Sequence, residues 1–218
     1  LKISYPVEPE ILVRSYTGKV LLALITTSLD SYLRIKNFKL KGTKKLIKKN
    51  IFNEHYIKKY KKSYMKKILF LTREKEIDLI VFGEYAFPFE ESNQIHKKFT
   101  KKIQRLCKQY NVYIIGGSYQ EFKETNHNVT LVFVPWRDQP FKIIKWICAK
   151  NDGETTTPAD RRQLKLIHSF FGYLTSLACI DISNSDFIIK GSILNMLKHS
   201  ISLDMIINPS RDGSGLSA

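Results

Sequence analysis

Three side chains that can do chemistry each stand at the end of an apolar run. Glu84 follows "IDLIVFG", Lys145 follows "FKII", and Cys179 lies near the end of "GYLTSLACI". A cysteine attacks an amide or nitrile carbon only as the thiolate, and a thiol with a pKa near 8.5 is mostly protonated at neutral pH. A neighbouring carboxylate can take that proton, and a fixed ammonium can stabilise the oxyanion formed by the attack. The residue types therefore predict covalent catalysis, with Cys179 as nucleophile, Glu84 as general base and acid, and Lys145 as oxyanion donor.

Further residues complete this arrangement or compete with its members. The backbone amide of Ile180 is a candidate second oxyanion donor, and Glu154 is a candidate second acid that orients the lysine. Lys150 is the alternative to Lys145, because the end of a strand is hard to place from sequence. This chemistry needs no cofactor. The five histidines have no ligand-like spacing, so we expect no metal site.

Each residue also has an ordinary structural interpretation. Cys179 could be a core residue, because free cysteine is among the most buried side chains. Glu84 could cap a loop, and Lys145 could be exposed on a hairpin. Cys107 lies on the apolar stripe of an expected helix, so we expect it in the core. The catalytic interpretation depends on three reactive side chains meeting at strand ends, where sites assemble in α/β sheets.

The elements that must position these residues alternate along the chain. Near-continuous apolar runs predict buried strands, and longer stretches with helical period separate several of them. The expected strands are 19–28, 77–85, 112–119, 128–136, 139–147, 172–180 and 203–210, with helices at 93–111, at 187–201 and in a lysine-rich stretch reaching about residue 73. Such alternation predicts an α/β fold in which helices cover the sheets.

Five motifs in this order resemble the carbon–nitrogen hydrolase (nitrilase) superfamily. They are "DLIVFGEYAFP", "VYIIGGSYQE" followed by "HNVTLVFVPW", "FKIIKWICAKNDGE", "GYLTSLACID" and "LDMIINPS", and together they cover roughly residues 18–210. The resemblance implies an α-β-β-α sandwich with a Glu-Lys-Cys triad. It also implies hydrolysis of a non-peptide carbon–nitrogen bond (amide, nitrile or carbamoyl) in a small molecule through a cysteine thioester, and a homodimer.

The sequence departs from the family pattern in several places, one of them a segment between the first strand and Glu84 that is longer than usual and carries the lysines. The aromatic residue that usually follows the cysteine is replaced by Ile180. The closing portion of the family fold is absent after Ala218, so we expect the C-terminal part to be missing. These departures leave the triad intact and bear on the identity of the substrate.

Composition limits the class of protein. The 218 residues, 43% of them hydrophobic, suffice for a single domain spanning 1–218. No apolar run approaches the ~20 residues of a membrane helix, so we expect no membrane partner. Three cysteines do not make a disulfide framework, which favours a reducing, cytoplasmic location.

Most of the net charge of +16 is concentrated in one segment. Between Arg34 and Lys67 there are fourteen Lys or Arg residues and one acid, Glu54. We expect a lysine-rich helical insertion at 34–73, because Tyr56, Tyr60, Tyr64, Ile68 and Leu71 recur at helical spacing. The favoured interpretation of this basic stretch is a solvated surface, and the alternative is a nucleic-acid contact. Two alternative functions follow: a nitrilase-like binding or scaffold module that uses the basic helix, and a thioester-forming acyltransferase.

Overall fold

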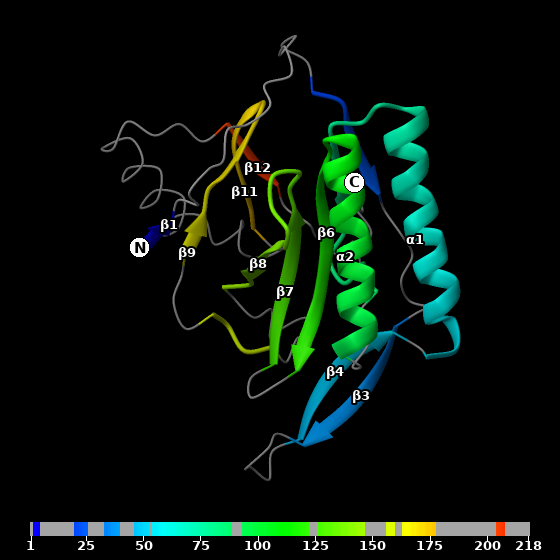
Figure 1. The fold of residues 1–218 in the computed structure, drawn as a ribbon. Coiled ribbons are helices and arrows are strands. Elements are labelled where there is room, and N and C mark those ends of the chain that lie inside the picture. Colours follow the sequence, from blue (N-terminus) through cyan, green and yellow to red (C-terminus); the bar gives the residue numbers. More distant parts are fainter. Residues whose placement is uncertain are drawn as a thin grey trace, which may run out of the picture.

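The fold is built around a five-stranded sheet (Figure 1). The computed structural model describes residues 2–4, 20–25, 33–39, 46–52, 54–88, 93–122, 126–146, 156–159, 163–177 and 204–207. The strands are β2 (Leu22–Ile25), β5 (Leu79–Phe82), β6 (Tyr113–Phe122), β7 (Asn126–Phe133) and β8 (Phe141–Ile144), in the order β2-β5-β6-β7-β8. The first three are parallel, and the β6-β7-β8 part is antiparallel. The predicted hairpin of residues 128–136 with 139–147 is thereby confirmed.

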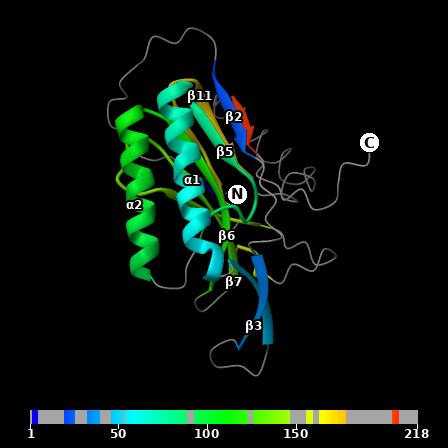
Figure 2. The same ribbon diagram turned by 90° about the vertical axis from the view of Figure 1, so that its right-hand side faces the viewer.

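Two helices cover one face of this sheet. They are α1 (Glu54–Glu74) and α2 (Asn93–Tyr110), which lie side by side (Figure 2). The spacing that predicted an amphipathic α1 is confirmed, since Tyr60, Tyr64 and Ile68 are buried against the sheet. In α2, Cys107 is fully buried in the same core cluster, as its position on the apolar stripe predicted.

A second sheet packs on the opposite face. It contains β10 (Ile167–Ser169), β11 (Gly172–Ser176) and β12 (Met205–Ile207), in that order. Alternate residues of β5 face the two layers, because Ile80 and Phe82 belong to the helix-side core while Leu79 and Val81 pack with the second sheet. The two helices, the five-stranded sheet and the second sheet form three successive layers of the predicted α-β-β-α sandwich. The expected helix at 187–201 lies outside the described residues.

The remaining strands form two small pairs. β1 (Lys2–Ser4) pairs in parallel with β9 (Gln163–Lys165). β3 (Leu33–Lys39) and β4 (Leu46–Phe52) form an antiparallel hairpin ahead of α1. None of the helices in the described ranges has both the length and the apolarity to span a bilayer.

Two sequence expectations about elements are wrong. The insertion at 34–73 is helical only from Glu54, because its first half is the β3–β4 hairpin. Leu33-Arg34-Ile35-Lys36 alternates apolar and basic residues, which is the period of a strand. The strand expected at 19–28 contains β2 but is not buried: as the edge strand of its sheet, it leaves Leu22 46% and Leu24 69% exposed.

Candidate active site

Glu84 sits in a tight turn at the carboxyl end of β5. The Ala86 N–H donates to the Gly83 carbonyl at 3.2 Å, and Tyr85 adopts a left-handed conformation with φ of 58°. Positive φ is costly for a residue with a bulky side chain, so surrounding contacts must hold it. The turn therefore aims Glu84 by backbone constraints rather than by side-chain packing alone.

An irregular segment of β6 fits against this turn. The β6–β7 register shifts between Ile115 and Ser118, and Gly117 has φ of 78°. A Cβ on Gly117 would lie 2.5 Å from the Gly83 carbonyl oxygen, so only glycine allows this approach. Bulges of this kind re-aim side chains next to sites.

Three hydrogen bonds fasten the turn to its neighbours, and a fourth fastens α1 to the adjoining segment of β6. The N–H of Tyr85 donates to Ser118 Oγ at 3.0 Å, and the N–H of Phe87 donates to the Ser118 carbonyl at 3.2 Å. From α1, the Tyr60 hydroxyl donates to the Ala86 carbonyl at 2.9 Å, and the Tyr64 hydroxyl donates to the Gly116 carbonyl of β6 at 2.6 Å. Helix α1 thus positions the acid-bearing turn directly.

Burial keeps one of these donors protonated. The pKa of Tyr64 is raised well above its ordinary value, first by burial and then by neighbouring Tyr60. Tyr64 also stacks on Phe82, with ring centroids 3.9 Å apart. Its hydroxyl is therefore a permanent donor in a rigid setting.

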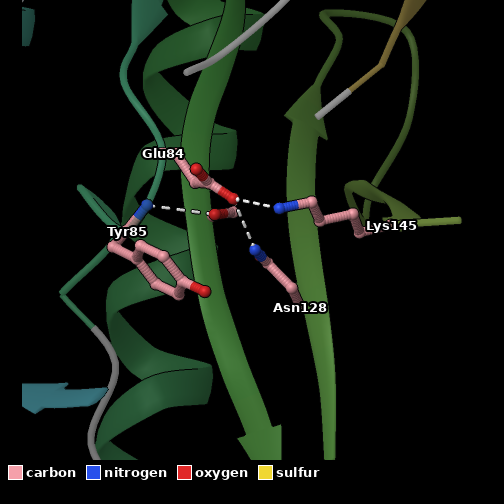
Figure 3. Close-up of polar contacts among 5 residues, drawn as sticks. Glu84, Tyr85, Asn128 and Lys145 are labelled. Atoms are coloured by element: carbon pink, nitrogen blue, oxygen red, sulfur yellow. Dashed lines mark hydrogen bonds and ion pairs between the residues drawn. The ribbon is translucent and has the colours of Figure 1, made fainter. Parts of the chain in front are cut away.

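Lys145 reaches Glu84 from the other side (Figure 3). It follows the last residue of β8, and its N–H donates to the Asn128 carbonyl at 2.9 Å, which extends the pairing of β7 with β8. Its ammonium lies 2.9 Å from Glu84 Oε1, and the side chains of Lys145 and Glu84 are only 3% and 4% exposed. Such a dry ion pair is strongly coupled, because little water screens it.

Asn128 completes the cluster. Its side-chain amide donates to Glu84 Oε1 at 2.7 Å, and the residue is 1% exposed. Both donors use the same carboxylate oxygen, so Oε2 is the oxygen that neither of them contacts (Figure 3). The arrangement holds the carboxylate in place through Oε1 and leaves Oε2 for another partner.

The structure brings together only part of the predicted site. Glu84 and Lys145 meet, and Lys145 points into the interior rather than to solvent. Cys179, Ile180, Glu154 and the alternative lysine Lys150 lie outside the described residues, so the catalytic roles remain predictions. Among the described residues, no three His, Cys, Asp or Glu side chains gather as a metal site would require.

Sequence reasoning did not identify Asn128 or Ser118 as site residues. A signal was available for Asn128, which opens an otherwise apolar strand and would need a hydrogen-bond partner if buried. Ser118 gave no such signal, because its role depends on a bulge that sequence does not reveal.

Comparisons with known proteins bear on the fold. No family model matches the chain, and a comparison with curated sequences finds no match either. Among solved structures, Saccharomyces cerevisiae Nit3, a member of branch 10 of the nitrilase superfamily, matches with a TM-score of 0.50 and 15% identity over 71% of this chain and 59% of Nit3. A carbon–nitrogen hydrolase from Helicobacter pylori G27 matches with a TM-score of 0.52 and 19% identity over 71% of this chain and 55% of that protein.

A third match covers more of the chain. A mutant of the amidase from Nesterenkonia sp. AN1 matches with a TM-score of 0.54 and 9% identity, over 91% of this chain and 68% of the amidase. The chain spans little more than half the length of the first two proteins. The resemblance expected from the motifs is confirmed at the level of architecture: this chain has the fold of the nitrilase superfamily.

Proposed function

We propose that this chain is a carbon–nitrogen hydrolase that cleaves an amide, nitrile or carbamoyl bond of a small molecule with Glu84, Lys145 and Cys179. The observation that carries the proposal is the buried ion pair between Lys145 and Glu84, 2.9 Å long. A buried pair is seldom more stabilising than apolar side chains of the same volume. A pair at the ends of two strands therefore favours a catalytic use.

The first half of the proposed reaction forms a thioester, written here for an amide. Glu84 accepts the thiol proton of Cys179, and the sulfur attacks the substrate carbon. The ammonium of Lys145 and the backbone N–H of Ile180 donate to the resulting oxyanion, each donor contributing about 3–4 kcal/mol by analogy with other oxyanion holes. The C–N bond then breaks, and Glu84 returns the proton to the leaving amine.

The second half releases the product. Glu84 takes a proton from water, whose oxygen attacks the thioester carbon. The C–S bond breaks, a carboxylic acid leaves, and the thiolate recovers a proton from Glu84. Oε2, which neither Lys145 nor Asn128 contacts, suits these proton transfers, because Oε1 is already held by those two residues.

The sequence position of Cys179 and one structurally similar protein support its proposed role as nucleophile. In the sequence, Leu177 stands two residues before Cys179, and its N–H extends the β11–β12 pairing by donating to the Ile207 carbonyl at 2.9 Å. Leu177 therefore extends a strand of the sheet that packs on β5. In the Nesterenkonia amidase mutant, the acetamide moiety of fluoroacetamide is covalently added at the active-site cysteine.

Intact-mass spectrometry with peptide mapping tests the proposal. The chain is incubated with fluoroacetamide and a panel of small amides and nitriles. We expect a single adduct that maps to Cys179, persists in Cys107→Ala and is lost in Cys179→Ala. An adduct on Cys107, or no adduct under any condition, would refute the proposal.

A further inference from the structure

The outward surface of the two helices carries a dense positive charge that the candidate site does not use. All of its members are exposed lysine or arginine side chains. They are Lys58, Lys59, Lys62 and Lys66 of α1 and Lys97, Lys98, Lys101, Lys102 and Arg105 of α2, together called the helical basic face. The basic region therefore includes α2, which lies outside the 34–67 stretch that carries most of the net charge of the sequence.

The two helices present these charges on one support. They lie side by side on the same side of the sheet (Figures 1 and 2). Phe99 of α2 packs against Tyr64 of α1 with ring centroids 5.8 Å apart, and the Lys61 ammonium lies 5.4 Å from the centre of the same Phe99 ring. Packed helices hold their axes about 8–10 Å apart, so the charges of both contribute to one field.

Little negative charge balances this surface. The sequence of α2 contains no acid, and the acids of α1 are its two end residues, Glu54 and Glu74. None of the nine side chains forms an ion pair with a carboxylate in the described part of the chain. Close like charges repel one another, and a bound polyanion would relieve that repulsion.

The spacing of the charges suits a row of phosphates. Lys58, Lys62 and Lys66 recur every four residues, as do Lys97, Lys101 and Arg105. Each row therefore advances about 6 Å per charge and spans about 12 Å. One strand of a nucleic-acid duplex presents a phosphate about every 3.4 Å along its axis, so roughly three or four phosphates lie along each row.

We propose that the helical basic face binds the phosphate backbone of a nucleic acid without reading its sequence. An anionic membrane is the weaker partner, because a helix that lies on a bilayer inserts apolar side chains beside its basic ones. The apolar sides of α1 and α2 are packed against the sheet. Among the described residues, Phe70 is the only large hydrophobic side chain on these helices that is exposed.

The hairpin continues the basic region. β4 ends at Phe52, and α1 begins at Glu54. In the β3–β4 register, Lys36 is paired with Lys49. The sequence of the hairpin is therefore basic as well.

Fluorescence anisotropy with a labelled 20-nucleotide RNA and the matching duplex, at several salt concentrations, tests this proposal. We expect micromolar Kd values near ~150 mM salt, the range of non-specific binding. With six phosphates neutralised on a duplex, affinity falls about 10³-fold between 50 and 200 mM salt. Each phosphate contact contributes about 0.9 to the slope of log K against log salt concentration. Replacing Lys97, Lys98, Lys101 and Lys102 by Gln should therefore lower that slope by up to about 3.6.

Matched variants separate charge from structure. Replacing the same four lysines by Arg keeps the charge, and Lys142→Gln removes an exposed lysine on β8; both should bind as the wild type does. Cys179→Ala should also bind normally, so failure of the proposed hydrolase leaves this test unaffected. Absence of binding at 50 mM salt, equal loss in the Gln and Arg variants, or binding to phosphatidylserine vesicles but not to nucleic acid would overturn the proposal.

Discussion

Removing the ammonium of Lys145 while keeping Glu84 should destabilise the fold severely. In Lys145→Met, the Glu84 carboxylate stays at 4% exposure and loses one of its two donors. Breaking a buried ion pair from one side costs about 3–5 kcal/mol, because an uncompensated charge remains. For a chain of this size, that corresponds to a fall in Tm of roughly 6–20 °C.

The double variant Glu84→Gln with Lys145→Met should recover most of this loss. It removes both charges, and the side-chain carbonyl oxygen of the introduced glutamine still accepts the hydrogen bond from Asn128 in this design. Lys142→Met is the matched control on β8, the strand that Lys145 follows. Lys142 also pairs with a glutamate, Glu121, but its side chain is 47% exposed, so we expect a cost of at most about 1 kcal/mol.

Urea unfolding of the wild type, both single variants and the double variant measures the coupling between the two charges. The expected interaction energy is several kcal/mol, whereas independent sites add within about 0.5 kcal/mol. Additive losses would refute the argument that the pair is dry and strongly coupled. The double variant also distinguishes activity from stability, because it should regain stability but have no hydrolase activity.

Three further predictions concern the acid-bearing turn and the cysteines. Tyr64→Phe removes the hydroxyl that anchors β6 and should cost about 1 kcal/mol in urea unfolding and lower kcat, whereas unchanged kcat would show that the anchor does not position the acid. Gly117→Ala places a Cβ 2.5 Å from the Gly83 carbonyl at positive φ, so it should lower both Tm and kcat, and a normal Tm would contradict the close fit. Burial raises the pKa of the Cys107 thiol, so this group stays protonated as pH rises through the usual cysteine range; iodoacetamide should label Cys179 first, and the two should label equally only after denaturation.

The layered fold was predictable because its signals are local. Continuous apolar runs predicted β5 and β6, and tyrosines at helical spacing predicted the buried side of α1. The meeting of Glu84 and Lys145 was also foreseeable, since both residues follow strands and strand ends converge in such sheets.

The features that could not be predicted from the sequence depend on tertiary contacts. The hairpin before α1 was assigned to a helix because lysine-rich composition masked a strand period. The role of Ser118 depends on a register shift beside Gly117, which no spacing reveals. The exposure of β2 follows from its position at the sheet edge, a property of strand order rather than of its own residues.

Helix α1 connects the two proposals while keeping them physically separate. Successive helical residues turn by about 100°, so Lys58 and Lys62 each lie about 200° from Tyr60, on the opposite side of the helix. The buried side holds the turn of Glu84 through the Tyr60 hydroxyl and anchors the adjoining β6 through the Tyr64 hydroxyl, and the exposed side carries charge. Because the buried side is packed in the core, changing the exposed lysines leaves the Tyr60–Ala86 hydrogen bond in place. A polyanion on the outer side would therefore anchor the protein without disturbing the acid, so that location and catalysis are set by different faces of one helix.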